Sequence, residues 1–123
     1  MRKRPTDAEL AILSVLWARG PSTVRQVAET LGRDTGYTTA LKLLQIMTEK
    51  GLVTRDETMR THVYAAASTE DQTQRQLVTD LLDRAFGGSA AKLVLQALAA
   101  KKASPEEVAE IRRLLDKERG GTR

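Results

Sequence analysis

The chain has 123 residues, of which 41% are apolar, enough for one ordinary domain or two small ones. It contains no cysteine and a single histidine, which excludes disulfides, thiol redox chemistry, cysteine-type zinc sites and most histidine-based catalysis. The net charge of +4 favours polyanionic partners, although ordinary solubility would explain a charge of this size equally well. Most of the excess lies in residues 1–67, where 10 Lys and Arg stand against 7 Asp and Glu.

The first twenty residues combine a basic start with an apolar run, as a signal peptide does. However, Asp7 and Glu9 separate MRKR from the run Leu10 to Ala18, and no small-residue cleavage site follows. No stretch approaches the roughly 20 apolar residues that a membrane-spanning helix needs. We therefore expect a cytoplasmic protein without direct membrane insertion.

Three helices are predicted within the first fifty residues. Thr6 to Glu9 forms a capping box, which opens a helix that runs to about Arg19 and stops at Gly20-Pro21. A second box, Thr23 to Gln26, opens a shorter helix that ends at Gly32. The third helix covers residues 37–50 and ends at Gly51.

This third helix has two faces. Its apolar side has the spacing of a helix packed on a core and carries Ala40, Leu43, Leu44 and Met47. Its other side is polar and carries Thr38, Lys42, Gln45 and Glu49. Because these polar side chains can form hydrogen bonds with a partner, the polar side is a candidate reading face.

A two-stranded hairpin is predicted after the helices. Leu52 to Arg55 and His62 to Ala65 are short and contain β-branched and aromatic residues, and residues 56–61 form a polar tip. An isolated hairpin is barely stable, so it must pack on the helices. Trp17 and Tyr64 are predicted to belong to the core or to a domain junction.

Everything from Ser68 onward is predicted to be helical. Ser68 to Asp71 caps a helix that Gly87-Gly88 breaks, Ser89 begins a second, and Ser104 to Glu107 opens a third. Residues 120–123 are expected to form a frayed tail.

These last helices have narrow apolar stripes and one aromatic residue, so we predict that the stripes meet a second copy of the chain. Folding back on the first domain is the alternative. The residues predicted at the dimer interface are Leu77, Leu81, Leu82, Phe86, Leu93, Leu98, Ile111, Leu114 and Leu115.

Three helices followed by a hairpin is the order of a winged helix. The predicted fold is therefore mainly α, with a winged-helix DNA-binding domain at residues 1–67 and an all-helical, three-helix dimerisation region at residues 68–123. The third helix would enter the major groove, and its first turn, at Tyr37 to Thr39, would offer free amides to phosphate.

Two long segments, TDAELAILSVLWARGPSTVRQVAETL and YTTALKLLQIMTEKGLV, together with the THVY ending of the wing, resemble the BlaI/MecI/CopY family of winged-helix repressors, the penicillinase repressor family. The resemblance covers nearly the whole chain. It implies a homodimer that binds a pseudo-palindromic operator on double-stranded DNA, one winged helix per half-site, and represses transcription. It implies no cofactor.

The resemblance also implies roles for residues of the reading helix. Thr38, Thr39 and Lys42 match DNA-facing positions of the family, whereas Gln45 and Ile46 stand where relatives often have basic residues. Ile46 cannot contact phosphate through a charge. Together with Tyr37, the polar members of this set form the predicted contacts of the reading helix.

In the wing around residues 53–66, Arg55, Arg60 and His62 are the predicted phosphate contacts. For either arginine, a solvated surface charge is the alternative. Asp56 and Glu57 are expected to point away from the DNA. His62 has too few potential partner ligands for a metal site. Residues 2–4 form a basic arm that either touches DNA or is disordered.

The mode of induction is left open. The family resemblance implies a membrane-bound metalloprotease sensor as a partner and cleavage in the dimerisation region, where Gln96-Ala97 takes the place of the usual Asn-Phe. Control by a small-molecule ligand is the alternative, and the missing cysteine-rich tail excludes copper sensing of the family's kind.

A second functional class also stays open. A winged helix used as a protein-interaction module would suit the modest net charge and the acidic wing tip. An enzyme is not expected, since no nucleophile–base pair, phosphate loop or carboxylate dyad is found.

Overall fold

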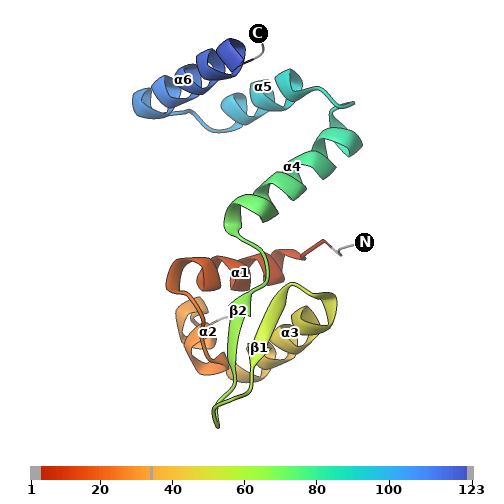
Figure 1. Ribbon diagram of the computed structural model, residues 1–123, viewed down its shortest axis with the longest axis vertical. Coiled ribbons are helices and arrows are strands. Elements are labelled where there is room, and N and C mark those ends of the chain that lie inside the picture. Colours follow the sequence, from red (N-terminus) through yellow and green to blue (C-terminus); the bar gives the residue numbers. More distant parts are fainter. Residues whose placement is uncertain (1–3, 34, 122–123) are drawn as a thin grey trace. The chain divides into compact units, whose positions relative to one another are not determined.

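The computed structural model describes residues 4–33 and 35–121, with side chains described up to residue 118 (Figure 1). The elements follow in the order α1 (Asp7–Arg19), α2 (Val24–Leu31), α3 (Tyr37–Lys50), β1 (Val53–Asp56), β2 (Val63–Ala66), α4 (Glu70–Ala85), α5 (Ala90–Ala100) and α6 (Pro105–Gly121). The predicted mainly helical fold with a winged helix at its N-terminal end is confirmed.

The chain divides into two compact units, Met1–Val78 and Thr79–Arg123. The predicted domain boundary after Ala67 stays a prediction. Within the described part of the chain, no helix is both long enough and apolar enough to cross a membrane.

The helix starts follow the capping residues of the sequence. Thr6 accepts a hydrogen bond from the Glu9 amide at 3.2 Å, and the Thr6 amide donates to the Glu9 carboxylate at 2.8 Å. Thr23 and Gln26 repeat this arrangement at α2. These reciprocal bonds satisfy amides that a helix start otherwise leaves unpaired, so both predicted capping boxes are confirmed.

The hairpin is antiparallel, with Val53 opposite Ala66 and Arg55 opposite Tyr64. Both strands begin one residue later than predicted: Leu52 and His62 lie outside them. The reason at β1 is that the Leu52 amide donates to the Met47 carbonyl at 2.9 Å, which closes the end of α3 before the ladder begins.

One further pairing was not predicted. Ser22, just before α2, forms an antiparallel bridge with Tyr64 of β2. The Ser22 amide donates to the Tyr64 carbonyl at 2.9 Å, and the Tyr64 amide donates back at 2.8 Å. The start of α2 is thereby held against the hairpin.

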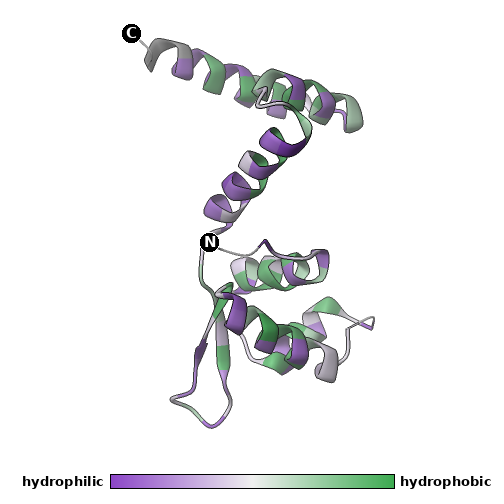
Figure 2. Ribbon diagram, turned by 90° about the vertical axis from the view of Figure 1, so that its right-hand side faces the viewer, coloured by the Kyte–Doolittle hydropathy of each residue, from purple (hydrophilic) through white to green (hydrophobic). Residues whose placement is uncertain are grey.

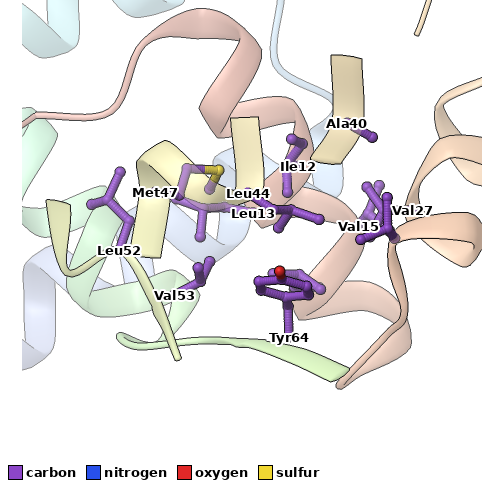
Figure 3. Close-up of a cluster of buried hydrophobic side chains, with 12 residues drawn as sticks. Ile12, Leu13, Val15, Val27, Ala40, Leu44, Met47, Leu52, Val53 and Tyr64 are labelled. Atoms are coloured by element: carbon purple, nitrogen blue, oxygen red, sulfur yellow. The ribbon is translucent and has the colours of Figure 1, made fainter. Parts of the chain in front are cut away.

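The core lies between α1, α2, α3 and the hairpin (Figure 3). Ile12 of α1, Val27 of α2, and Leu44 and Met47 of α3 are fully buried, and the ring of Tyr64 closes the core from the side of the hairpin. The predicted core face of α3 is confirmed, except that Leu43 is only partly buried.

Trp17 lies at the edge of this core and is partly buried. Its indole N–H donates to the Ser68 carbonyl at 2.9 Å, which ties α1 to the segment that follows the hairpin. The prediction that Trp17 and Tyr64 belong to the fold is confirmed.

The helices after the hairpin have a different character. Within the predicted capping segment Ser68 to Asp71, Thr69 is the residue that caps α4, since its hydroxyl accepts from the Gln72 amide at 3.0 Å. Ser89 and Ser104 cap α5 and α6 as predicted. The expected frayed tail is wrong for Gly120 and Gly121, because α6 continues through Gly121, and residues 122–123 lie outside the described part.

Candidate nucleic-acid interface

The outer face of α3 is polar and exposed. Thr38, Thr39, Lys42 and Gln45 are all exposed, while Ala40, Leu44 and Met47 on the opposite side are buried. None of these four polar side chains forms a hydrogen bond or ion pair with another residue that the structure describes. The helix therefore presents to solvent a row of donors and acceptors that are free to bond a partner.

The start of α3 is also open. Its N-cap is Gly36, which has no side chain to bond the first-turn amides, and Tyr37, the first helical residue, is 53% exposed. Uncapped amides and the positive end of the helix dipole favour an anion at this point.

The far end of α3 is held by a partly buried ion pair. The Lys50 Nζ lies 2.6 Å from Glu9 Oε1, and the Glu9 side chain is almost completely buried. Burial would raise the pKa of Glu9, but the hydrogen bonds from Lys50 and Thr6 and the charge of Lys50 together hold that pKa below its ordinary value. The pair fastens the end of α3 to the start of α1.

In the wing, Arg55 is paired within the hairpin. Its Nε and Nη2 both lie 2.8 Å from Glu57 Oε2. Residues two apart on an extended chain share a face, which brings the two charges together. The expectation that Asp56 and Glu57 point away from the DNA stays a prediction. Asp56 instead accepts two bonds from Thr58, at 2.9 Å from its amide and 2.7 Å from its hydroxyl, and these bonds lower the pKa of Asp56.

Arg60 and His62 lie on the returning arm of the wing and are exposed. His62 Nε2 lies 4.0 Å from Glu57 Oε1. With Tyr37, Arg60 and His62 line a hollow of about 360 Å³ that also contains Thr23 and Arg25 from the start of α2.

The structure thus brings together three of the predicted contacts and adds a basic residue that sequence reasoning missed. Arg25 is the second residue of α2 and is exposed. In the sequence, the only sign of its role was a basic residue beside a helix start. Of the predicted basic arm, residues 2 and 3 lie outside the described part, and the Arg4 carbonyl accepts from Lys50 at 3.4 Å.

The residues predicted for dimerisation are exposed or half-buried. Leu114 and Leu115 of α6 are 54% and 64% exposed, and no side chain described between residues 79 and 118 is buried. Figure 2 shows hydrophobic and hydrophilic bands along these helices. Gln96 and Ala97 lie within α5, and both are exposed.

Comparison with known proteins gives a consistent picture. The family model described as penicillinase repressor matches residues 5–117. The transcriptional regulator BlaI from two strains of Mycobacterium tuberculosis, CDC 1551 / Oshkosh and H37Rv, is 40% identical over 82 residues, which cover 64% of this chain. The chain's match spans 59% of the length of these curated relatives.

Solved structures resemble the chain less closely. A MarR family transcriptional regulator from Silicibacter pomeroyi is 23% identical, with a TM-score of 0.46, over 94% of this chain and 69% of its own. The solution structure of apo-NmtR is 26% identical, with a TM-score of 0.48, over 70% of this chain and 71% of its own. The assignment therefore depends on the sequence match over residues 5–117, and on that match the chain belongs to the penicillinase repressor family.

Proposed function

We propose that the protein is a homodimeric, sequence-specific DNA-binding repressor of transcription. The observation that carries this function is the exposed polar face of α3, whose side chains have no partner among the described residues and whose other side is fixed in the core. Membership of the penicillinase repressor family and the similarity to a transcriptional regulator support it.

The geometry suits a major groove, which is wide enough to accept one α-helix. Thr38, Lys42 and Gln45 carry hydroxyl, ammonium and amide groups that can bond base edges or phosphates. The Glu9–Lys50 pair and the packed inner face hold α3 in place, so little order would have to be gained on binding.

The dimer is supported by the C-terminal unit. Apolar residues of α5 and α6, among them Leu95, Leu98 and Leu115, are exposed in the single chain. Helices that leave this much apolar surface in water need a partner to cover it. A second copy of the chain would cover these apolar stripes with its own. The two-fold symmetry of such a dimer would match a pseudo-palindromic operator.

Release from DNA would occur in the cytoplasm by cleavage of the dimerisation region, with a membrane-bound metalloprotease sensor as the partner that triggers it. Gln96-Ala97 is exposed, but it lies in the middle of α5, so the helix must unwind before a protease can bind this peptide bond in extended form. Small-molecule control remains the alternative mode.

The test is fluorescence anisotropy with a duplex from the DNA upstream of the protein's own gene and a scrambled duplex of the same composition. We expect a clear preference for the former, and a log–log salt slope of about −6 or steeper for a dimer that neutralises several phosphates per half-site. Equal binding of both duplexes at physiological salt would overturn the proposal. A nuclease-resistant protein partner would then favour the interaction-module function.

A further inference from the structure

We propose that the hollow between the starts of α2 and α3 and the wing seats a phosphate of the DNA backbone, and that Glu57 is the counter-ion that occupies Arg55 when DNA is absent. This inference rests on the proposed function and adds to it a contact residue, Arg25, and an attenuating residue, Glu57.

The hollow has the chemistry of an anion site. It is formed by three segments distant in the sequence: the start of α2 with its N-cap, the start of α3, and the hairpin. The lining residues are Thr23, Val24, Arg25, Tyr37, Leu41, Arg60, Thr61, His62 and Tyr64. Two arginines and a histidine therefore line a hollow of about 360 Å³. None of the described residues that line it is acidic.

The cationic groups of the hollow are available. Arg25 and Arg60 are exposed, and neither forms a hydrogen bond or ion pair with any residue in the described ranges. An arginine has five donors in a planar fork that matches two oxygens of a phosphate. The uncapped first turn of α3 begins at Tyr37, in the same wall, and adds the positive end of a helix dipole.

The position of Arg25 relative to the wing is fixed by backbone pairing. The bridge between Ser22 and Tyr64 holds the residue just before α2 against β2. Tyr64 is itself buried in the core and lines the hollow, so its wall cannot shift without disturbing the core. A phosphate would meet side chains on a preformed frame rather than on a loose loop.

Glu57 lies where it can compete with such a phosphate. Its carboxylate is bonded to Arg55 at 2.8 Å and lies 4.0 Å from His62 Nε2, a residue of the hollow. Arg55 pairs across the hairpin with Tyr64, another residue of the hollow. A backbone phosphate that reaches this edge must replace Glu57 as the partner of Arg55, because otherwise the Glu57 carboxylate repels the phosphate. Asp56 does not compete in this way, since Thr58 holds it at the turn.

The occupant is a phosphate of a DNA strand because the hollow adjoins the reading face. Tyr37 lies in its wall, and the exposed Thr38 follows directly in the chain. When the start of a recognition helix lies in a major groove, the adjacent backbone passes the elements on either side of it. A free phosphate would share the chemistry, so the experiment separates the two sources.

The test compares Arg25→Gln and Glu57→Gln with Arg112→Gln, a control that removes an exposed charge from α6. Operator affinity is measured by fluorescence anisotropy over a series of salt concentrations, with thermal melting to confirm folding. We expect Arg25→Gln to weaken binding roughly tenfold and to make the salt slope of the dimer less steep by about 2, one phosphate per half-site. Glu57→Gln should tighten binding about threefold or more, and Arg112→Gln should match the wild type.

A second measurement locates the phosphate. Duplexes with a single neutral methylphosphonate are scanned along the half-site. At one position the substitution should lower the affinity of the wild type but not that of Arg25→Gln, which already lacks the contact.

The inference alone would be overturned if Arg25→Gln bound DNA as Arg112→Gln does while the wild type still selected its operator. A wild type without sequence preference would overturn the proposed function as well. Saturable binding of inorganic phosphate at constant ionic strength, abolished by Arg25→Gln without change in DNA affinity, would reassign the hollow to a free anion and also refute the inference.

Discussion

In the proposed function, buried residues of α3 stabilise the fold and exposed residues of α3 contact DNA. We expect Leu44→Ala to lower the free energy of unfolding by about 2 to 5 kcal/mol, because the fully buried side chain would leave a cavity. Lys42→Ala, on the exposed side, should leave the melting temperature unchanged and weaken operator binding. Urea unfolding and anisotropy measure the two effects. Equal destabilisation by both substitutions would refute this division of the helix.

Glu9 gives stability a dependence on pH. Its pKa in the folded protein lies below the ordinary value of 4.5, so its contribution is fully present above that pH and is lost as the pH falls through the lower, folded pKa. We expect the free energy of unfolding to decrease in this acidic range, and Glu9→Gln to flatten the decrease. The matched control is Glu49→Gln, which changes an exposed carboxylate of α3. Parallel pH profiles for Glu9→Gln and the wild type would contradict the assignment.

At the scale of elements, the corner between α3 and β1 depends on one backbone conformation. Gly51 ends α3 with φ +79°, in the left-handed region, and its amide donates to Met47 and Thr48 carbonyls. A Cβ here would meet nothing within 4 Å, so the cost of a side chain is conformational only. We expect Gly51→Ala to destabilise the protein by about 1 to 2 kcal/mol.

Gly36→Ala is the matched control, because Gly36 also borders α3 in open space but has φ −78°. Ala is a poorer N-cap than Gly, but it also restricts the unfolded chain, so the two effects should largely cancel and leave a change of only a few tenths of a kcal/mol. Thermal melting of the two variants measures the difference. A cost for Gly36→Ala as large as for Gly51→Ala would show that the left-handed conformation of Gly51 is not the source of the cost at this corner.

At the scale of the whole molecule, DNA affinity should depend on pairing of two chains. We expect Leu115→Asp, which places a charge on the exposed apolar stripe of α6, to give monomers by light scattering. Operator affinity should then fall by a factor of about 100 or more, because two half-sites no longer act together. Arg112→Asp on the same helix is the control and should remain dimeric. A Leu115→Asp variant that remains dimeric would remove this leucine from the interface.

The local parts of the fold could be read from the sequence because their causes are local. Thr6 with Glu9 and Thr23 with Gln26 form bonds over three residues, and the same short spacing places Leu44 and Lys42 on opposite sides of one helix. The strand positions were wrong by one residue, since Leu52 satisfies its amide on α3 before the ladder starts. The pairing of Arg55 with Glu57 was missed although its cause is also local.

Contacts between residues far apart in the chain were decided only by the tertiary structure. Glu9 and Lys50 are 41 positions apart, and Ser22 meets Tyr64 across a bridge that places Arg25 beside the wing. By itself, the sequence determined the order of elements, the polar and apolar sides of α3 and the apolar stripes of the C-terminal helices, because capping, turn chemistry and periodicity act within a few residues. The hollow and the Glu9–Lys50 ion pair required the folded chain, since only packing of the core brings such distant side chains within reach of each other.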